Sequence, residues 1–167
     1  VLESVGQNSR QRCRGVTAQL IQHSAHFFGE LVSFDAFRLE IAVTARPPQT
    51  FGWINGEHPV QVILGRDEST LYASECRITG HRSKGNRGRF TLEPTADRIR
   101  RFGTKEFRSE RHRLVPTPRL MFRHPLSGSF VQREVVDLSG SGFSVEESEA
   151  ASVLLPGLIL PSVELNF

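Results

Sequence analysis

Two groups of side chains in the second half of the chain have the types and spacing to bind an anionic ligand. One is the turn Asp137-Leu138-Ser139-Gly140-Ser141-Gly142, which joins the apolar segments 131–138 and 143–145. The other is the arginine-rich run 107–113, which lies before these segments. Arginine binds phosphate bidentately, and serine hydroxyls donate hydrogen bonds to phosphate oxygens. Together the two groups predict a site for a phosphorylated guanine ligand.

Four residues of the turn have chemistry that suits a bound ligand. Gly140 and Gly142 lack a Cβ and can adopt positive φ, which favours a concave nest of backbone N–H groups. Ser139 can donate to a phosphate or a base edge. Asp137 can accept from the N1–H and N2–H₂ edge of guanine, or it can hold an arginine. Taken alone, however, the turn is also an ordinary hairpin and the arginine run an ordinary solvated linker.

Composition restricts the other functions that this chain could have. The 167 residues contain two cysteines, Cys13 and Cys76, which predicts free thiols in a reducing, cytoplasmic compartment. We interpret Cys76 as a small apolar strand residue. No apolar run is long enough to span a membrane. No Walker loop, nucleophile elbow or carboxylate pair is recognisable, so we expect no enzymatic activity.

A metal site is also not expected. His23 and His26 have a spacing that could suit a metal on a helix, but no further ligand completes a set. We therefore predict neither a metal nor a cofactor.

The elements that position the turn read mainly as β-strands. Short apolar or alternating segments are separated by turn signals, without a long helical period, which predicts a small all-β barrel. The segment 16–21 could be a helix or a strand, and the glycine-rich segment 80–88 reads as a solvated hairpin loop in preference to an anion site. The expected strands are Phe28–Phe34, Phe37 with Leu39, Ile41 and Val43, Val60 with Val62 and Leu64, Tyr72–Ile78, and Phe90–Leu92.

A charged connector at 95–113 separates this region from a second β region that contains Leu120, Phe122, the segments around the turn, and 156–167. We place the boundary near residue 103, which predicts an N-terminal domain of residues 1–102 and a C-terminal domain of residues 103–167. The fold class is thus mainly all-β, with two small antiparallel barrels. The second is expected to be truncated, since the chain stops within the alternating run 163–167.

These residues resemble a known family. Asp137, Ser139 and Gly142 match the [DN]xSxxG motif of PilZ domains, bacterial receptors for cyclic di-GMP that carry an RxxxR motif just before their barrel. The upstream segments Phe27–Asp35, Val60–Leu64, Leu71–Gly80 and Phe90–Pro94 resemble the split-barrel N-terminal domain of flagellar-brake (YcgR-like) proteins. The resemblance covers the chain from about residue 25 to its end.

The resemblance implies a cyclic di-GMP sensor in which ligand binding orders the connector and changes the angle between two domains. The ligand-binding residues that it implies are Arg108, Arg111, Arg113, Asp137, Ser139, Gly140 and Gly142. A protein effector such as the flagellar or secretion machinery would be the downstream partner. The incomplete barrel could complete its sheet by forming a homo-oligomer.

One departure from the family pattern leaves alternatives open. Ser109 stands where the first arginine of RxxxR is expected, with Arg108 and Arg111 on either side. Either arginine could replace it, or the protein could be a degenerate PilZ module that mediates interactions without ligand. A third reading is a β-barrel that binds single-stranded nucleic acid, which requires aromatic residues among the basic ones on one sheet face. The phenylalanines fall mainly at core-like strand positions, which weighs against that reading.

Overall fold

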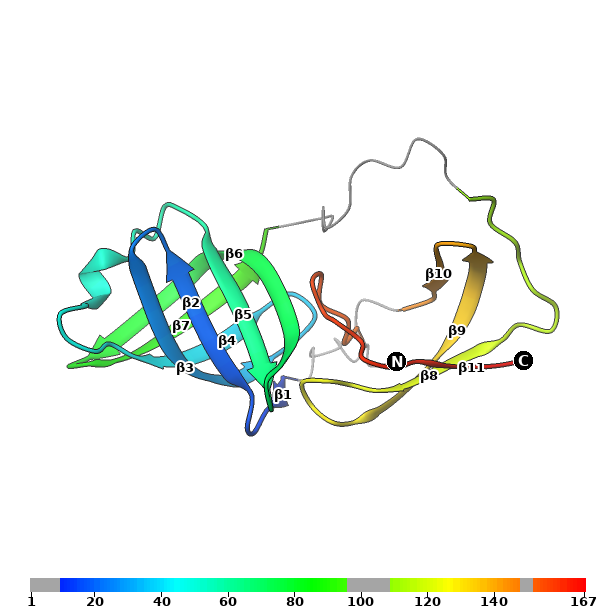
Figure 1. Cartoon of the computed structure of the whole chain (residues 1–167), viewed down its shortest axis with the longest axis horizontal. Coiled ribbons are helices and arrows are strands. Elements are labelled where there is room, and N and C mark those ends of the chain that lie inside the picture. The colour runs from blue at the N-terminus through cyan, green and yellow to red at the C-terminus, as the bar shows by residue number, and fades with distance from the viewer. Residues whose placement is uncertain (1–9, 96–108, 148–151) are drawn as a thin grey trace, which may run out of the picture.

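The computed structural model describes residues 10–95, 109–147 and 152–167, which form two β units (Figure 1). The predicted all-β class is confirmed: apart from one 3₁₀ turn, the regular elements of the described residues are strands, paired antiparallel. The elements of the first unit are β1 (Gln11–Arg12), β2 (Thr17–Gln22), β3 (Ala25–Phe34), β4 (Leu39–Thr44), η1 (Phe51–Trp53), β5 (Val60–Arg66), β6 (Ser69–Lys84) and β7 (Arg87–Pro94).

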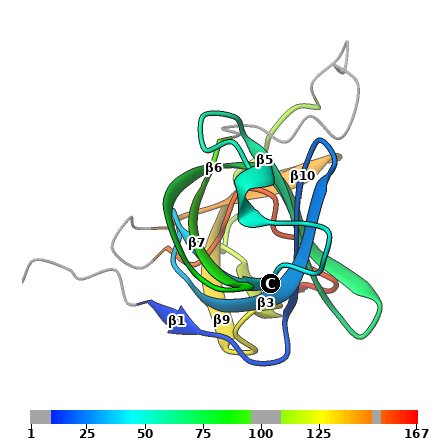
Figure 2. The ribbon, with the colours of Figure 1, turned by 90° about the vertical axis from the view of Figure 1, so that its left-hand side faces the viewer.

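The first unit is a closed barrel of six strands, to which the short β1 is added at one rim. The strand order is β1-β3-β2-β5-β6-β7-β4, and pairing of β3 with β4 closes the ring. Viewed from one end, the strands encircle the core (Figure 2). The segment 16–21, for which helix and strand were both open, forms β2.

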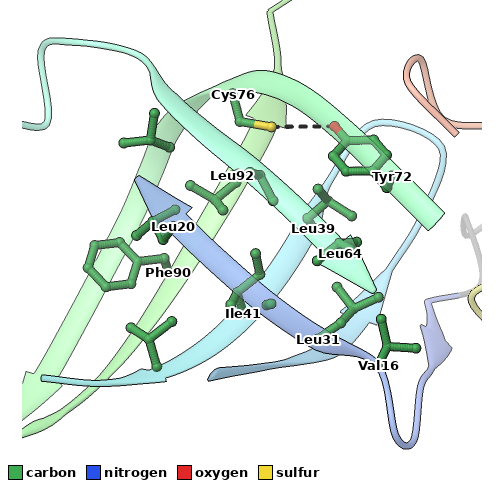
Figure 3. Close-up of a cluster of buried hydrophobic side chains, with 14 of the residues drawn as sticks. Val16, Leu20, Leu31, Leu39, Ile41, Leu64, Tyr72, Cys76, Phe90 and Leu92 are labelled. Atoms are coloured by element: carbon green, nitrogen blue, oxygen red, sulfur yellow. Dashed lines mark hydrogen bonds between the residues drawn. The ribbon is translucent and has the colours of Figure 1, made fainter. Parts of the chain in front are cut away.

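The barrel core follows from the alternation along its strands. Leu39, Ile41 and Val43 of β4 are at most 2% exposed, while the residues between them face outward. Apolar side chains from the other strands meet them in the interior (Figure 3). Burial of this one face provides the main driving force for closure.

Cys76 is fully buried in this core, which confirms its interpretation as an apolar strand residue. Its Sγ lies 3.4 Å from the hydroxyl of Tyr72 (Figure 3). Desolvation raises the pKa of the Cys76 thiol to about 11. Cys13 is the other cysteine, and both are free thiols, as predicted.

Two sequence-based expectations for this unit were wrong. The segment 80–88 is not an extended loop: β6 continues to Lys84 and β7 begins at Arg87, so only Gly85 and Asn86 form the turn. Gly85 supplies the left-handed conformation (φ +61°) that a two-residue hairpin requires. Phe37 is not an inward strand residue but 51% exposed, because the Asp35 carboxylate accepts hydrogen bonds from the N–H groups of Phe37 and Arg38 and turns the chain there.

Two glycines allow close approaches within the barrel. At Gly29 of β3, a Cβ would overlap the backbone carbonyl of Ala42 on β4. At Gly88 of β7, a Cβ would lie 2.7 Å from the ring of Phe51, which packs from η1 against Phe27 and Phe90. The absence of these two side chains therefore lets β3 approach β4 and lets η1 pack against the barrel core.

The second unit is an open four-stranded sheet, where the sequence predicted an incomplete barrel. Its strands are β8 (Arg119–Arg123), β9 (Phe130–Ser139), β10 (Gly142–Val145) and β11 (Glu164–Asn166), in the order β10-β9-β8-β11. Leu120, Phe122, Val131 and Val135 form its buried centre. The predicted domain boundary near residue 103 lies outside the described residues and stays a prediction.

The two units share part of their apolar core. Leu126, from the β8–β9 connection, and Leu155 are 1% and 4% exposed and belong to the apolar cluster of the barrel. The ring of His124 stacks on Phe34 of β3, with centroids 5.0 Å apart. The backbone N–H of Ile159 donates to a carbonyl of β6 at 2.8 Å. The second unit is therefore packed against the barrel and not merely tethered to it.

His124 makes this junction sensitive to protonation. Its Nδ1 accepts from the backbone N–H groups of Leu126 and Ser127 at 3.2 and 3.3 Å, so the proton of the neutral ring lies on Nε2. Nε2 donates to the carbonyl of Val153 at 2.9 Å. Burial lowers the pKa of His124, because a charged imidazolium would lose its hydration.

Candidate ligand-binding site

The described end of the arginine run lies against the end of β9. The backbone N–H of His112 donates to the carbonyl of Leu138 at 2.9 Å, and the N–H of Leu138 donates back to His112 at 3.0 Å. This pair is an isolated antiparallel bridge. It brings the run 109–113 alongside the turn 137–142, two segments that the sequence predicted to form one site.

An ion pair joins the two segments directly. The Arg111 guanidinium donates to a carboxylate oxygen of Asp137 at 2.8 Å. The Ser144 hydroxyl, from β10, also donates to this carboxylate, and the two contacts lower the pKa of Asp137 from its usual value, the Ser144 hydrogen bond being the larger cause. Asp137 is therefore a carboxylate at neutral pH, able to accept from a cation or from a base edge.

The Ser139 hydroxyl makes its hydrogen bonds within the turn, which the sequence did not predict. Ser139 donates through Oγ to the carbonyl of Gly142 at 3.0 Å and accepts from the N–H of Ser141 at 3.4 Å. Gly142 has a positive φ of +155°, whereas Gly140 is not among the residues with positive φ. The backbone nest expected from both glycines is therefore not formed, and the Ser139 hydroxyl bonds within the turn.

Ser109 fills the space beside Gly140. Its Oγ lies 3.6 Å from the point where a Cβ of Gly140 would be. That separation is an ordinary van der Waals distance, so an alanine at position 140 would also fit beside the linker. Ser109 thus lies next to the turn, at the position where the PilZ motif has an arginine.

The remaining arginines are placed differently. Arg113 is exposed and lines a separate depression of about 290 Å³, together with Glu134, Val136 and Glu146. It forms no ion pair within residues 10–95, 109–147 and 152–167. Arg108 lies outside the described residues. The structure therefore unites Arg111, Asp137, Ser139 and the glycine turn, and it leaves Arg113 at the margin.

Ser144 is a residue of this cluster that the sequence analysis did not identify. Its position opposite Asp137 follows from the β9–β10 register, in which Gly142 pairs with Ser139. A two-residue turn at Gly140 and Ser141 implies that register. The signal was therefore present in the hairpin pattern, although no motif marks the residue.

Other candidate chemistry is not supported by side-chain arrangement. No group of three or more metal-ligating side chains occurs in the part of the chain that the structure describes. His26 contacts Gln19 at 3.1 Å and packs against the Phe28 ring in a tilted arrangement, while His23 lies beside His58. A search of the helices in the described ranges finds none with the length and apolar character to cross a membrane.

Comparison with known proteins gives structural likeness only. No family model and no curated protein matches the chain. One solved structure, described as "MrkH, A novel c-di-GMP dependence transcription regulatory factor", has 16% identity and a TM-score of 0.34 over 75% of this chain and 48% of its own. The MrkH–c-di-GMP complex from K. pneumonia has 18% identity and a TM-score of 0.32, over 75% of this chain and 51% of that one.

The Borreliella burgdorferi PlzA protein in complex with c-di-GMP has 14% identity and a TM-score of 0.39, over 77% of this chain and 64% of its own. The chain thus spans about half the length of the MrkH structures that it matches. Likeness at these identities and TM-scores assigns neither a family nor a ligand, so the function is argued from the residues.

Proposed function

We propose that this chain is a PilZ-like sensor that binds cyclic di-GMP between the arginine linker and the β9–β10 turn. The observation that carries the proposal is the Arg111–Asp137 ion pair, at 2.8 Å, between the two segments that carry the motif residues. Arg111 and Asp137 are distant in sequence, have side chains that can bind a guanine nucleotide, and are neighbours in the fold.

The ligand would use the cluster in two ways. Arg111 and Arg113, with Arg108, would bind the two phosphates bidentately and reach the O6/N7 edge of guanine. Asp137 would accept from the N1–H and N2–H₂ edge of the other side of the base. Ser139 and the backbone of Gly140 and Gly142 would close the site after the Ser139 hydroxyl turns from the Gly142 carbonyl to the ligand.

The ion pair gives the ligand-free site a defined starting state. Arg111 is 58% exposed and Asp137 is 23% exposed, so the pair contributes little to stability but holds the linker near the turn. A ligand that offers both a phosphate and a guanine edge replaces both halves of the pair. A simple phosphate replaces only one half and leaves Asp137 without its cation, so the pair favours the complete nucleotide.

Binding would then be transmitted through the linker to the barrel. The linker lies between β7 and β8 in sequence, so fixing it on the turn restricts the angle between the two units. The shared core around Leu126 limits how far that angle can change, since larger movements expose buried side chains. The output surface would be read by a protein effector, for which flagellar or secretion machinery is the candidate that the family resemblance implies.

A second candidate function is a ligand-independent interaction module. Ser109, which lies beside Gly140 in place of an arginine, is the observation that favours it. Serine provides one hydroxyl where the family motif provides a guanidinium, and this loss removes a bidentate phosphate contact. The two candidates share the fold and differ only in whether the site takes ligand.

Calorimetric titration of cyclic di-GMP separates the two candidates. Wild type would be compared with Arg111→Ala and Arg113→Ala, with GTP as ligand control and Arg119→Ala as a matched loss of one exposed arginine on β8. We expect saturable binding of cyclic di-GMP that each linker variant weakens about tenfold or more and that Arg119→Ala preserves. GTP should bind more weakly, because it offers one guanine in place of two. No heat from folded wild-type protein at high ligand concentration would refute the sensor and favour the interaction module.

A further inference from the structure

A second charged surface lies on the outside of the barrel, away from the linker site. Strands β3, β4, β7 and β6 are consecutive neighbours, and their registers align Phe28, Thr44, Arg87 and Lys84 in one row. The adjacent row contains Glu30, Ala42, Arg89 and Arg82. Along β7, Gly88 and Phe90 are buried, whereas Arg87 and Arg89 alternate with them and are exposed. The residues of both rows therefore face outward. We call Arg82, Lys84, Arg87 and Arg89 the cationic face.

The cationic face has an arrangement that works against folding. Arg82 pairs directly across from Arg89, and Lys84 pairs directly across from Arg87. Like charges at directly opposed positions destabilise an antiparallel pair. Charged side chains often protect a free strand edge from pairing with other chains. That role does not explain Arg87 and Arg89, because β7 is paired on both sides, with β4 and β6. A bound polyanion would relieve the repulsion.

Few carboxylates neutralise this face. Arg89 pairs with Glu40 at 3.1 Å, and Glu40 also contacts Arg10 at 3.7 Å. In the described ranges, Arg82, Lys84 and Arg87 form no ion pair. Within the two rows themselves the one acidic residue is Glu30, in the same row as Arg89. The surface therefore keeps a net positive charge toward solvent.

An exposed aromatic side chain continues the same surface. Phe28 is 46% exposed, and the ring of His26 packs against it at an interplanar angle of 34°, with centroids 4.2 Å apart. Beside it lies a depression of about 160 Å³ whose lining includes Phe28, Arg46, Pro47 and Pro48. This depression, the slot, offers an aromatic ring and a guanidinium, which both favour stacking of a planar base, and two apolar pyrrolidine rings beside them.

We propose that the outer face of β3, β4, β7 and β6 binds single-stranded nucleic acid. One unpaired base stacks in the slot on Phe28, and the phosphates continue across the cationic face. Strands are about 4.8 Å apart, so the three steps from β3 to β6 cover about 14 Å, enough for a short run of nucleotides. The proposal does not depend on cyclic di-GMP binding, because it uses a different surface and different residues.

Fluorescence anisotropy with fluorescein-labelled 15-mers of oligouridylate and oligothymidylate, over a series of salt concentrations, tests the proposal. Four neutralised phosphates predict a slope of log K against log salt of about −2.8, and Arg82→Gln/Arg87→Gln should reduce it to about −1.4. Phe28→Ala should weaken binding about fivefold or more at every salt concentration, because it removes one stacking platform. A labelled duplex of the same length should bind more weakly, since its bases are not free to stack.

Matched variants on the second sheet provide the controls. Arg119→Gln/Arg123→Gln removes the same charge from β8, and Phe130→Ala removes a side chain that is 65% exposed on β9. Both should bind like wild type. Phe28→Leu keeps an apolar side chain of similar size and should bind as weakly as Phe28→Ala if stacking is the cause. Unfolding midpoints of all variants establish that each is folded.

Several results would overturn the proposal. One is no binding at low salt, and another is an equal loss for the β8 variant and the cationic-face variant. A salt slope that falls as predicted, together with no effect of either Phe28 substitution, would also refute it. That last outcome would assign the face to acidic partners in general, such as an acidic protein.

Discussion

Replacement of Leu126 by alanine tests whether the two units share one core. The Leu126 side chain is 1% exposed and lies in the barrel cluster, although it belongs to the β8–β9 connection. The substitution removes three buried carbon groups, worth about 2.4 kcal/mol at ~0.8 kcal/mol each. A residual cavity adds to this, so we expect a loss in the free energy of unfolding of about 3 kcal/mol.

The single tryptophan makes the assay specific. Trp53 lies in η1 of the barrel and is 45% exposed, so its fluorescence in a urea titration reports barrel unfolding. Val115→Ala is the control, since Val115 is 96% exposed and should change stability by less than about 0.5 kcal/mol. If Leu126→Ala left the Trp53 transition unchanged, the β8–β9 connection would not be part of the barrel core and the shared-core argument would be wrong.

Three further predictions follow from buried or crowded positions. Gly29→Ala should destabilise the barrel by about 2 kcal/mol or more, measured by urea unfolding, because the new Cβ meets the Ala42 carbonyl; a stability equal to wild type would show that β3 can move away without cost. Stability should fall as pH drops below 6.5, since the unfolded state binds a proton that buried His124 resists; an NMR titration giving His124 a pKa at or above 6.5 would contradict this. Burial raises the pKa of both Cys13 and Cys76 to about 11, so neither thiol should react quickly with a thiol reagent at pH 7 until urea unfolds the protein; rapid native-state labelling of Cys76 would contradict its burial.

The barrel strands could be predicted because their side chains alternate between core and solvent. Leu39, Ile41 and Val43 show this pattern, and all three are buried. The same pattern failed at Phe37, where a local hydrogen bond from the Phe37 N–H to the Asp35 carboxylate overrides the alternation. The segment 80–88 was misread because glycine and charged residues are typical of loops. In the structure these residues form the end of the β6–β7 hairpin, and Gly80, Arg82 and Gly88 occupy strand positions.

The sequence marked the two segments that meet at the end of β9, but not the contacts between them. Arg111 and Asp137 form a cluster across these segments, and the ligand-binding role of the motif residues stays a prediction. The distance of Arg113 from that cluster could not be predicted, because residue spacing in a linker does not determine the path of the backbone. The exposure of Phe28 also escaped prediction. It lies between buried Phe27 and the inward-facing Gly29, and only the register of β3 decides which face it occupies.

Closure of the first sheet has a consequence for how other chains can attach to this protein. Every strand of the six-stranded ring has a neighbour on each side over part of its length, but β6 pairs with β5 only as far as Cys76, so residues 77–84 pair with β7 alone. The second sheet ends at β10 and β11. These edge strands have four and three residues, and β10 carries a bulge at Ser144 and Val145. Edges this short resist aggregation by strand addition. A partner that extends the sheet would gain only a few backbone hydrogen bonds, so its side chains would determine whether it binds, and β10 would bring it next to Asp137.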